Sequence, residues 1–305
     1  MSEILKKLLI PFLAFVIVAI IFFVSKTTIT PTIKVSSTAK TTSSIVSSEP
    51  VISNDISSNI SSEIDDKSGF DANISGIPII CYHHLLTKEQ KGTIKNSIIA
   101  TTDELESHLK ILKQKGYSSL TCEQVLDFIK NGKQIPKKSV FLTIDDGYKS
   151  TIYLAAPIFR KYAFKAMVFV ITKNLDEPYE EFDPINKKFQ YFNKAEMETA
   201  KDVFEFADHT YDLHIELTKQ TKDKINSDLL ISKEKLNSPY FAYPIGAFNS
   251  TLINIIKEFG FFAAFTINRG HAKIDSNLFT IPRYCVLSPM SAEKLLDIVE
   301  GRAIR

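Results

Sequence analysis

Short apolar runs alternate with amphipathic segments from Ile77 toward the end of the chain. The apolar runs predict buried strands at 77–82, 140–144, 166–171, 203–207, 240–243 and 261–267. Helical spacing and capping residues predict helices after Thr101, after Thr121, and over 150–162, 218–237 and 249–259. Because apolar strands that alternate with helices are typical of parallel sheets covered on both faces, we expect an α/β fold, closed as a barrel or open. Functional residues then gather at the carboxyl ends of the strands.

The first part of the chain has a different pattern. An uncharged run, Leu8–Val24, is flanked by lysines, which predicts a signal anchor over residues 1–26, or a cleaved signal peptide, and in both cases export. Residues 27–72 are rich in Ser and Thr and cannot bury enough apolar surface to fold, so we expect a flexible linker there. The folded domain is predicted at 73–305, on the extracytoplasmic side of a cell membrane.

Composition excludes several classes of protein. The charges nearly balance, with 37 Lys and Arg against 35 Asp and Glu. The protein therefore has no strong positive electrostatic field that would attract nucleic acid. Three cysteines, at positions 81, 122 and 285, are too few for a disulfide framework, and none forms a CxxC pair. We therefore expect neither a disulfide scaffold nor thiol-ligated zinc. Glycine-rich nucleotide-binding loops are missing as well.

Candidate chemistry follows two of the predicted strands. TIDDG places Asp145 and Asp146 directly after a buried run, and adjacent carboxylates point in different directions, so one can ligate a metal while the other faces a water. His209 and His214 would diverge by about 140° on a helix, so they converge only where a strand end turns into a loop. Together with Asp146 they make a set that suits Zn, Fe, Co or Ni. Each motif alone also fits a structural turn or ordinary histidines.

A third motif, FAYPIG, leaves the strand predicted at 240–243. Gly246 permits a tight turn that brings backbone close to a ligand. The N–H of Ile245 is then a candidate donor to a developing oxyanion. The alternative is an ordinary turn between a strand and a helix.

TIDDG, HTYDLH and FAYPIG in this order resemble the polysaccharide deacetylase family (NodB homology, carbohydrate esterase family 4). The resemblance covers about residues 77–286, and the branch with the most similar motifs includes poly-β-1,6-N-acetylglucosamine deacetylases. It implies a distorted (β/α) barrel and metal-dependent removal of acetyl groups from N-acetylated sugars. By motif, Asp145 is the implied general base. The implied ligands of a divalent ion, zinc first, are Asp146, His209 and His214.

The sequence departs from the family pattern at three places. Ala242 stands where many members carry an Arg that orients the catalytic Asp, and we predict that Arg283 replaces it. Ile245 stands where many members carry an aromatic residue. The late Leu-x-His motif, which supplies the general acid, is not visible after residue 286. His83 and His271 are the remaining candidates for that role, with a structural role as the alternative for each.

Aromatic residues beside the motifs are candidates for sugar contact. Tyr148 and Tyr243 are predicted to bind substrate together with His83, although most aromatic residues in a barrel belong to the core. The helix at 218–237 alternates Lys with Asp and Glu, which is typical of a solvated face.

The leading interpretation is a membrane-tethered hydrolase, a polysaccharide N-deacetylase. Its substrate would be a cell-wall polysaccharide or exopolysaccharide that contains N-acetylglucosamine, and its partners would be that polymer and the membrane, without nucleic acid. One alternative is a non-catalytic glycan-binding module derived from such an enzyme. Another is an esterase that removes O-acetyl groups from xylan-like glycans.

Overall fold

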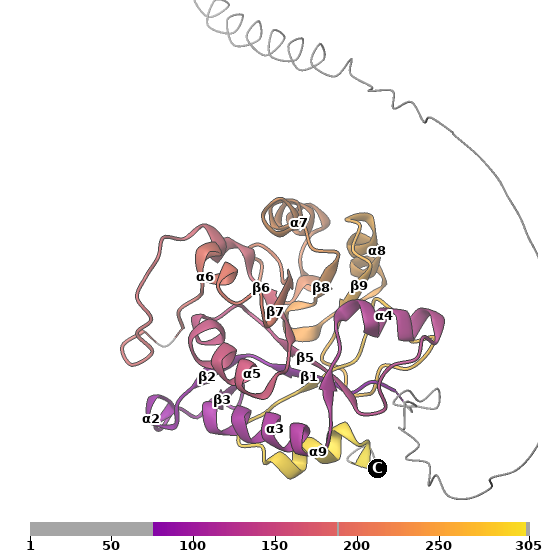
Figure 1. The fold of residues 1–305 in the computed structure, drawn as a ribbon. Helices are drawn as coiled ribbons and strands as arrows, with labels where there is room; N and C mark the ends of the chain where they lie inside the picture. The colour runs from indigo at the N-terminus through magenta and orange to yellow at the C-terminus, as the bar shows by residue number, and fades with distance from the viewer. Residues whose placement is uncertain (1–75, 188, 303–305) are drawn as a thin grey trace, which may run out of the picture. The chain divides into compact units, whose positions relative to one another are not determined.

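A computed structural model describes residues 76–187 and 189–302, and its centre is a parallel sheet (Figure 1). The strands of this sheet, in chain order, are β1 (Ile79–Tyr82), β4 (Ser118–Ser119), β5 (Ser139–Ile144), β6 (Ala166–Val170), β7 (Phe204–Asp208), β8 (Tyr240–Ala242), β9 (Ala263–Phe265) and β10 (Tyr284–Cys285). A separate parallel pair consists of β2 (His84–Leu86) and β3 (Ile99–Thr101). The α/β fold with a parallel sheet, predicted from the apolar runs, is confirmed.

The sheet curves so that one segment joins its two edges. The strand order is β10-β1-β5-β6-β7-β8-β9, and β4 pairs with β5 beside this path. Ile281 pairs in parallel with Phe265 of β9, and a few residues later β10 pairs with β1. The chain around 281–285 therefore links β9 to β1 and completes a distorted barrel.

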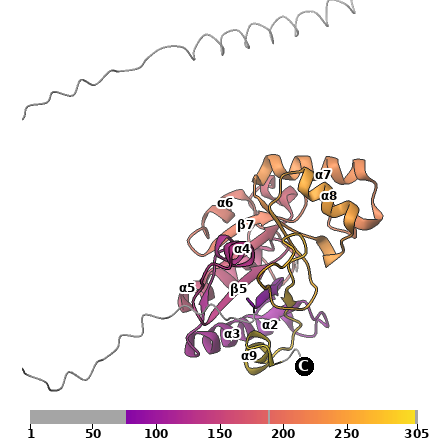
Figure 2. The same cartoon turned by 90° about the vertical axis from the view of Figure 1, so that its right-hand side faces the viewer.

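Helices cover the outside of this sheet. They are α2 (Lys88–Lys91), α3 (Thr102–Gln114), α4 (Cys122–Asn131), α5 (Ala156–Tyr162), α6 (Lys194–Glu198), α7 (Lys222–Leu236), α8 (Ser250–Glu258) and α9 (Ala292–Val299). Shorter turns are η1 (Thr151–Ala155, a π-helical turn), η2 (Thr172–Asp176), η3 (Leu217–Lys219) and η4 (Pro244–Gly246). In two views, α7 and α8 lie on one side of the sheet and α3 and α9 on the opposite side (Figures 1 and 2). The predicted capping boxes at Thr101 and Thr121 begin α3 and α4.

The core follows from strand alternation, because successive side chains of a strand point to opposite faces. Ile80 and Leu142 pack outward in one apolar cluster with residues of α3, α5 and α9. Ile79 and Phe141 face inward in another cluster, which residues of α4 join. The two clusters fix both faces of β1 and β5, and so hold the strand ends that carry the candidate site.

The predicted anchor at 1–26 and linker at 27–72 lie outside the described residues. Among residues 76–187 and 189–302, no helix has both the length and the apolar character needed to cross a bilayer.

Candidate active site

Asp145 and Asp146 follow β5 directly, at the carboxyl end of the sheet. The Asp145 N–H donates to the carbonyl oxygen of Tyr82 at 2.9 Å, which extends the pairing with β1 by one step. The chain then turns through two left-handed residues, with φ of 76° at Asp146 and 80° at Gly147. A Cβ atom at position 147 would lie 3.1 Å from Val170, so glycine fits here for space as well as for conformation. The turn directs the two carboxylates to different partners.

The two histidines, which both follow β7, meet Asp146 across the end of β6, the strand between β5 and β7. His209 follows β7, and a left-handed residue, Thr210 (φ 74°), turns the chain into the loop that carries His214. The Nε2 atoms of His209 and His214 lie 3.5 and 3.1 Å from Oδ1 of Asp146. One ligand atom from each of the three residues lies within 4.8 Å of the others. The structure thus brings together the three residues that the sequence singles out as metal ligands.

This donor set fits a divalent ion. Oδ1 of Asp146 is buried and accepts no hydrogen bond of regular geometry from the described residues, although two imidazole nitrogens face it. His209 donates its Nδ1–H to the carbonyl oxygen of Ala242 at 2.8 Å, which leaves Nε2, the nitrogen that faces Asp146, as the atom that could ligate an ion. Burial alone would raise the pKa of Asp146, but the two imidazoles hold it well below its usual range, so the carboxylate is charged. Two imidazoles and one carboxylate are typical ligands of Zn²⁺ and related ions.

The loop that carries His214 is held by a buried carboxylate that the sequence does not single out. Asp228, on α7, accepts the backbone N–H groups of Tyr211, Asp212 and Leu213 at 2.8, 2.9 and 2.8 Å. The prediction that this helix presents only a solvated face is therefore wrong at Asp228, which is buried. No signal in the alternating charges of α7 distinguishes this aspartate from its exposed neighbours, because its partners are backbone atoms of a distant loop.

Asp145 pairs with Arg283 in the interior of the barrel. Nη1 and Nη2 of Arg283 each donate to one carboxylate oxygen of Asp145 at 2.7 Å. Nη1 also reaches the Thr143 hydroxyl, and Nε donates to the carbonyl oxygen of Thr266. Burial would raise the pKa of Asp145, but the Arg283 guanidinium outweighs it and the net pKa is lowered. Arg283 thus makes the contact with Asp145 that the side chain of Ala242 cannot make.

A pocket of about 340 Å³ opens over these groups. Both aspartates and both candidate histidines line it. Ile245 also lines it, in a left-handed conformation with φ of 59°. Tyr148 and Tyr243 line it too, but only 7% and 1% of their surfaces are exposed, so their rings form pocket wall and leave little face for stacking on a sugar.

The two histidines considered as general acids occupy different places. His83 lines the pocket, and its Nε2 lies 4.0 Å from Oδ2 of Asp145. His271 does not line the pocket; its Nε2 donates to the carbonyl oxygen of Ile298, and its neighbour Ala272 pairs with Ile77, ahead of β1. His271 is therefore wrong as a candidate, because it lies near the opposite end of the strands.

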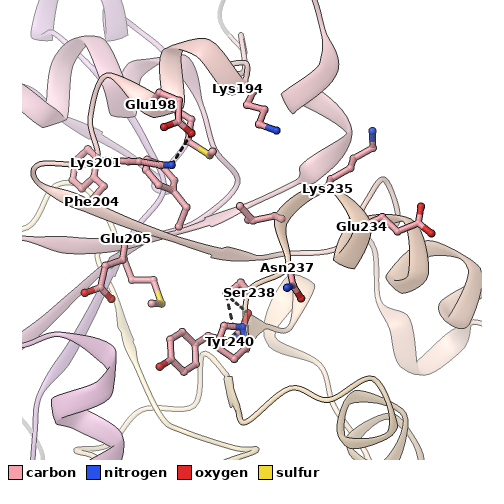
Figure 3. Close-up of a pocket in the computed structure, with 15 residues that line it drawn as sticks. Lys194, Glu198, Lys201, Phe204, Glu205, Glu234, Lys235, Asn237, Ser238 and Tyr240 are labelled. Carbon is pink, nitrogen blue, oxygen red and sulfur yellow. Dashed lines mark hydrogen bonds and ion pairs between the residues drawn. The ribbon is translucent and has the colours of Figure 1, made fainter. Parts of the chain in front are cut away.

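A larger cavity, about 680 Å³, lies away from this pocket (Figure 3). It is formed where β7 and β8 begin, between α6 and the end of α7, and its wall mixes both signs of charge. Lys201 and Glu198, three residues apart in the chain, pair beside it at 2.7 Å, while Lys194 and Lys235 extend from α6 and α7 (Figure 3). None of the candidate residues lines it, and it lies at the amino ends of these strands, where a barrel seldom carries its chemistry.

Comparison with known proteins points to one family. The profile of the family described as polysaccharide deacetylase matches residues 132–264. A poly-β-1,6-N-acetyl-D-glucosamine N-deacetylase of Staphylococcus aureus is 32% identical over 223 residues, which cover 68% of this chain and 74% of that protein.

Solved structures have the same fold. The Streptococcus pyogenes deacetylase PplD, in complex with acetate, superposes with a TM-score of 0.62 at 27% identity over 73% of this chain and 98% of that one. IcaB from Ammonifex degensii superposes with a TM-score of 0.61 at 23% identity over 74% of this chain and 97% of that one. The parallel barrel and the pocket at its carboxyl end agree with these similarities in sequence and fold. The chain belongs to the polysaccharide deacetylase family and is a hydrolase of the polysaccharide N-deacetylase class.

Proposed function

We propose that this protein removes N-acetyl groups from a polysaccharide that contains N-acetylglucosamine, and that it needs a divalent metal ion to do so. The observation that carries the proposal is the convergence of Asp146, His209 and His214 within 4.8 Å of one another, with Asp145 in the same pocket. The name of the Staphylococcus aureus relative supports a β-1,6-linked polymer as the first substrate to test.

The residues divide the chemistry between them. A divalent ion held by Asp146, His209 and His214 would supply Lewis acidity, polarising the amide carbonyl and making a water a better nucleophile. Asp145 takes the proton of the attacking water, since an unassisted water is a weak nucleophile. Arg283 keeps the Asp145 carboxylate ionised and fixes its orientation through two hydrogen bonds.

Two further groups complete the reaction. The Ile245 N–H donates to the oxyanion that forms as water adds to the carbonyl, a contribution of about 3–4 kcal/mol where such donors have been removed from other enzymes. His83 gives a proton to the leaving amine, because it is the histidine of the two candidates that lines the pocket. The carbon–nitrogen bond then breaks, with acetate and the free amine as products.

The place of action is part of the same proposal. Residues 1–26 anchor the chain in the cell membrane, and residues 27–72 tether the domain on the extracytoplasmic side. Zinc is the first candidate for the ion, with Co, Ni or Fe as alternatives.

Acetate release from the β-1,6-linked polymer, and from peptidoglycan, tests the proposal. The full-length protein should release acetate, lose this activity after treatment with a chelator and dialysis, and regain it when Zn²⁺ or Co²⁺ is added. Release that persists without any metal would refute the metal-dependent mechanism. Binding of the polymer without turnover would favour the glycan-binding module, and preference for O-acetyl substrates in competition would favour the esterase.

A further inference from the structure

Two cysteines far apart in the sequence lie side by side below the pocket. Cys81 of β1 and Cys285 of β10 are direct partners in the parallel ladder, so their side chains point to the same face of the sheet. Both thiols are free. Cys81 is fully buried, while Cys285 is half-buried and lines the pocket. The steps proposed for deacetylation use neither thiol.

A histidine and a carboxylate complete the cluster. Sγ of Cys81 lies 4.0 Å from Nδ1 of His83, and Nε2 of His83 lies 4.0 Å from Oδ2 of Asp145. One ligand atom from each of these three residues lies within 4.8 Å of the others. Around a tetrahedral ion, ligand atoms lie roughly 3.5 Å apart, so binding requires only a small contraction of the cluster.

We propose that Cys81, His83 and Asp145 form a second metal site, with Cys285 as a fourth donor, and that this site takes a thiophilic divalent cation, Zn²⁺ or Cd²⁺. Thiolate and imidazole are the soft and intermediate donors that such ions select. The site differs from the group at Asp146, which contains no sulfur. No CxxC pair marks this site in the sequence, because strand pairing, and not local spacing, brings the thiols together.

Charges in the cluster balance when the ion binds. Arg283 is close and opposes a cation, but it is already paired with both oxygens of Asp145. Each carboxylate oxygen has a second lone pair, and Oδ2 faces His83. Binding of the ion releases the protons of the two thiols to solvent, with no change of oxidation state. Two thiolates then neutralise the divalent charge.

The consequence for activity rests on the function proposed above. A cation in this site would engage the Asp145 carboxylate and the His83 ring, so neither could exchange protons with substrate. We therefore expect excess Zn²⁺ or Cd²⁺ to inhibit the enzyme after its first ion is bound.

Cadmium absorption tests the site without reference to activity. Thiolate ligation of Cd²⁺ produces an ultraviolet charge-transfer band that imidazole and carboxylate ligands do not produce. In reduced full-length protein, this band should reach saturation by the second equivalent of Cd²⁺, because the group at Asp146 takes the other equivalent and contains no sulfur. The band should remain in His214→Ala, which removes a ligand from the other metal group, and disappear in Cys81→Ser.

The chain has three cysteines, so two more variants complete the set. Cys122→Ser, which removes a thiol buried on α4 elsewhere in the core, should keep the full band. Cys285→Ser should reduce the band by about half, which provides a test if Cys81→Ser does not fold. A wild-type protein without the band, or an unchanged band in both Cys81→Ser and Cys285→Ser, would overturn the site. An intact band in a protein that releases no acetate would overturn the proposed function and leave the site standing.

Discussion

Three residues of the candidate site have left-handed backbone conformations that L-residues seldom adopt. They are Asp146, Thr210 and Ile245, with φ of 76°, 74° and 59°. Such conformations cost on the order of 1–3 kcal/mol each and persist where the surrounding structure enforces them. Here they place Asp146, the loop that carries His214, and Ile245 in the wall of one pocket. In the sequence, a glycine directly after Asp146 and another directly after Ile245 indicate turns at these two positions. Nothing in HTYDLH predicts the turn at Thr210.

The pair of Asp145 and Arg283 should dominate stability at this site. Replacing Arg283 with Gln leaves a carboxylate buried without its guanidinium, so we expect a loss of about 3–5 kcal/mol in the free energy of unfolding. Urea denaturation of the full-length protein measures it. Arg283→Lys should recover part of the loss, because one ammonium cannot replace two parallel hydrogen bonds.

A matched control is Arg160→Gln, which breaks the exposed pair with Asp202. We expect less than about 1 kcal/mol from this variant. Equal losses in the two variants would contradict a special role for the buried pair.

Among the elements, α7 connects the outside of the fold to the site. Asp228 uses both carboxylate oxygens, Oδ1 for Tyr211 and Oδ2 for Asp212 and Leu213, and so holds the loop that ends at His214. The apolar runs predicted β1, β5, β6, β7, β8 and β9, and the capping boxes predicted where α3 and α4 begin. They did not predict β2, β3, β4 or β10, because these strands of two or three residues do not lie in apolar runs long enough to show a pattern.

Asp228→Asn should weaken metal binding while leaving the fold intact. An asparagine has one acceptor oxygen, and its NH₂ group would face a backbone N–H, so the loop loses part of its support. We expect about a 10- to 100-fold weaker affinity for the divalent ion, measured by competition with a chelating dye. Asp223→Asn makes the same change at an exposed position of α7 and should leave affinity unchanged. An unaltered affinity in Asp228→Asn would show that the loop does not depend on this carboxylate.

In the whole molecule, the curved parallel sheet assembles the pocket from distant parts of the chain. Asp145 and Arg283 are 138 residues apart, and the closure between β9 and β1 brings them together. The order of the motifs, and the rule that active sites lie at the carboxyl ends of parallel strands, were enough to predict that Asp145, Asp146 and the two histidines lie at that end of the sheet. The neighbourhood of Cys81 and Cys285 and the remote location of His271 depend on strand order and closure, which no local pattern encodes.

The most direct test measures bound divalent metal and acetate release on the same preparations of three full-length proteins, the wild type, Asp145→Asn and His209→Ala. If Asp145 is the base and His209 a ligand, Asp145→Asn keeps its ion but loses at least about 100-fold in acetate release. His209→Ala loses the ion of the Asp146 group, and the activity with it. Acetate release that survives in His209→Ala, or turnover that is unchanged in Asp145→Asn, would contradict the account.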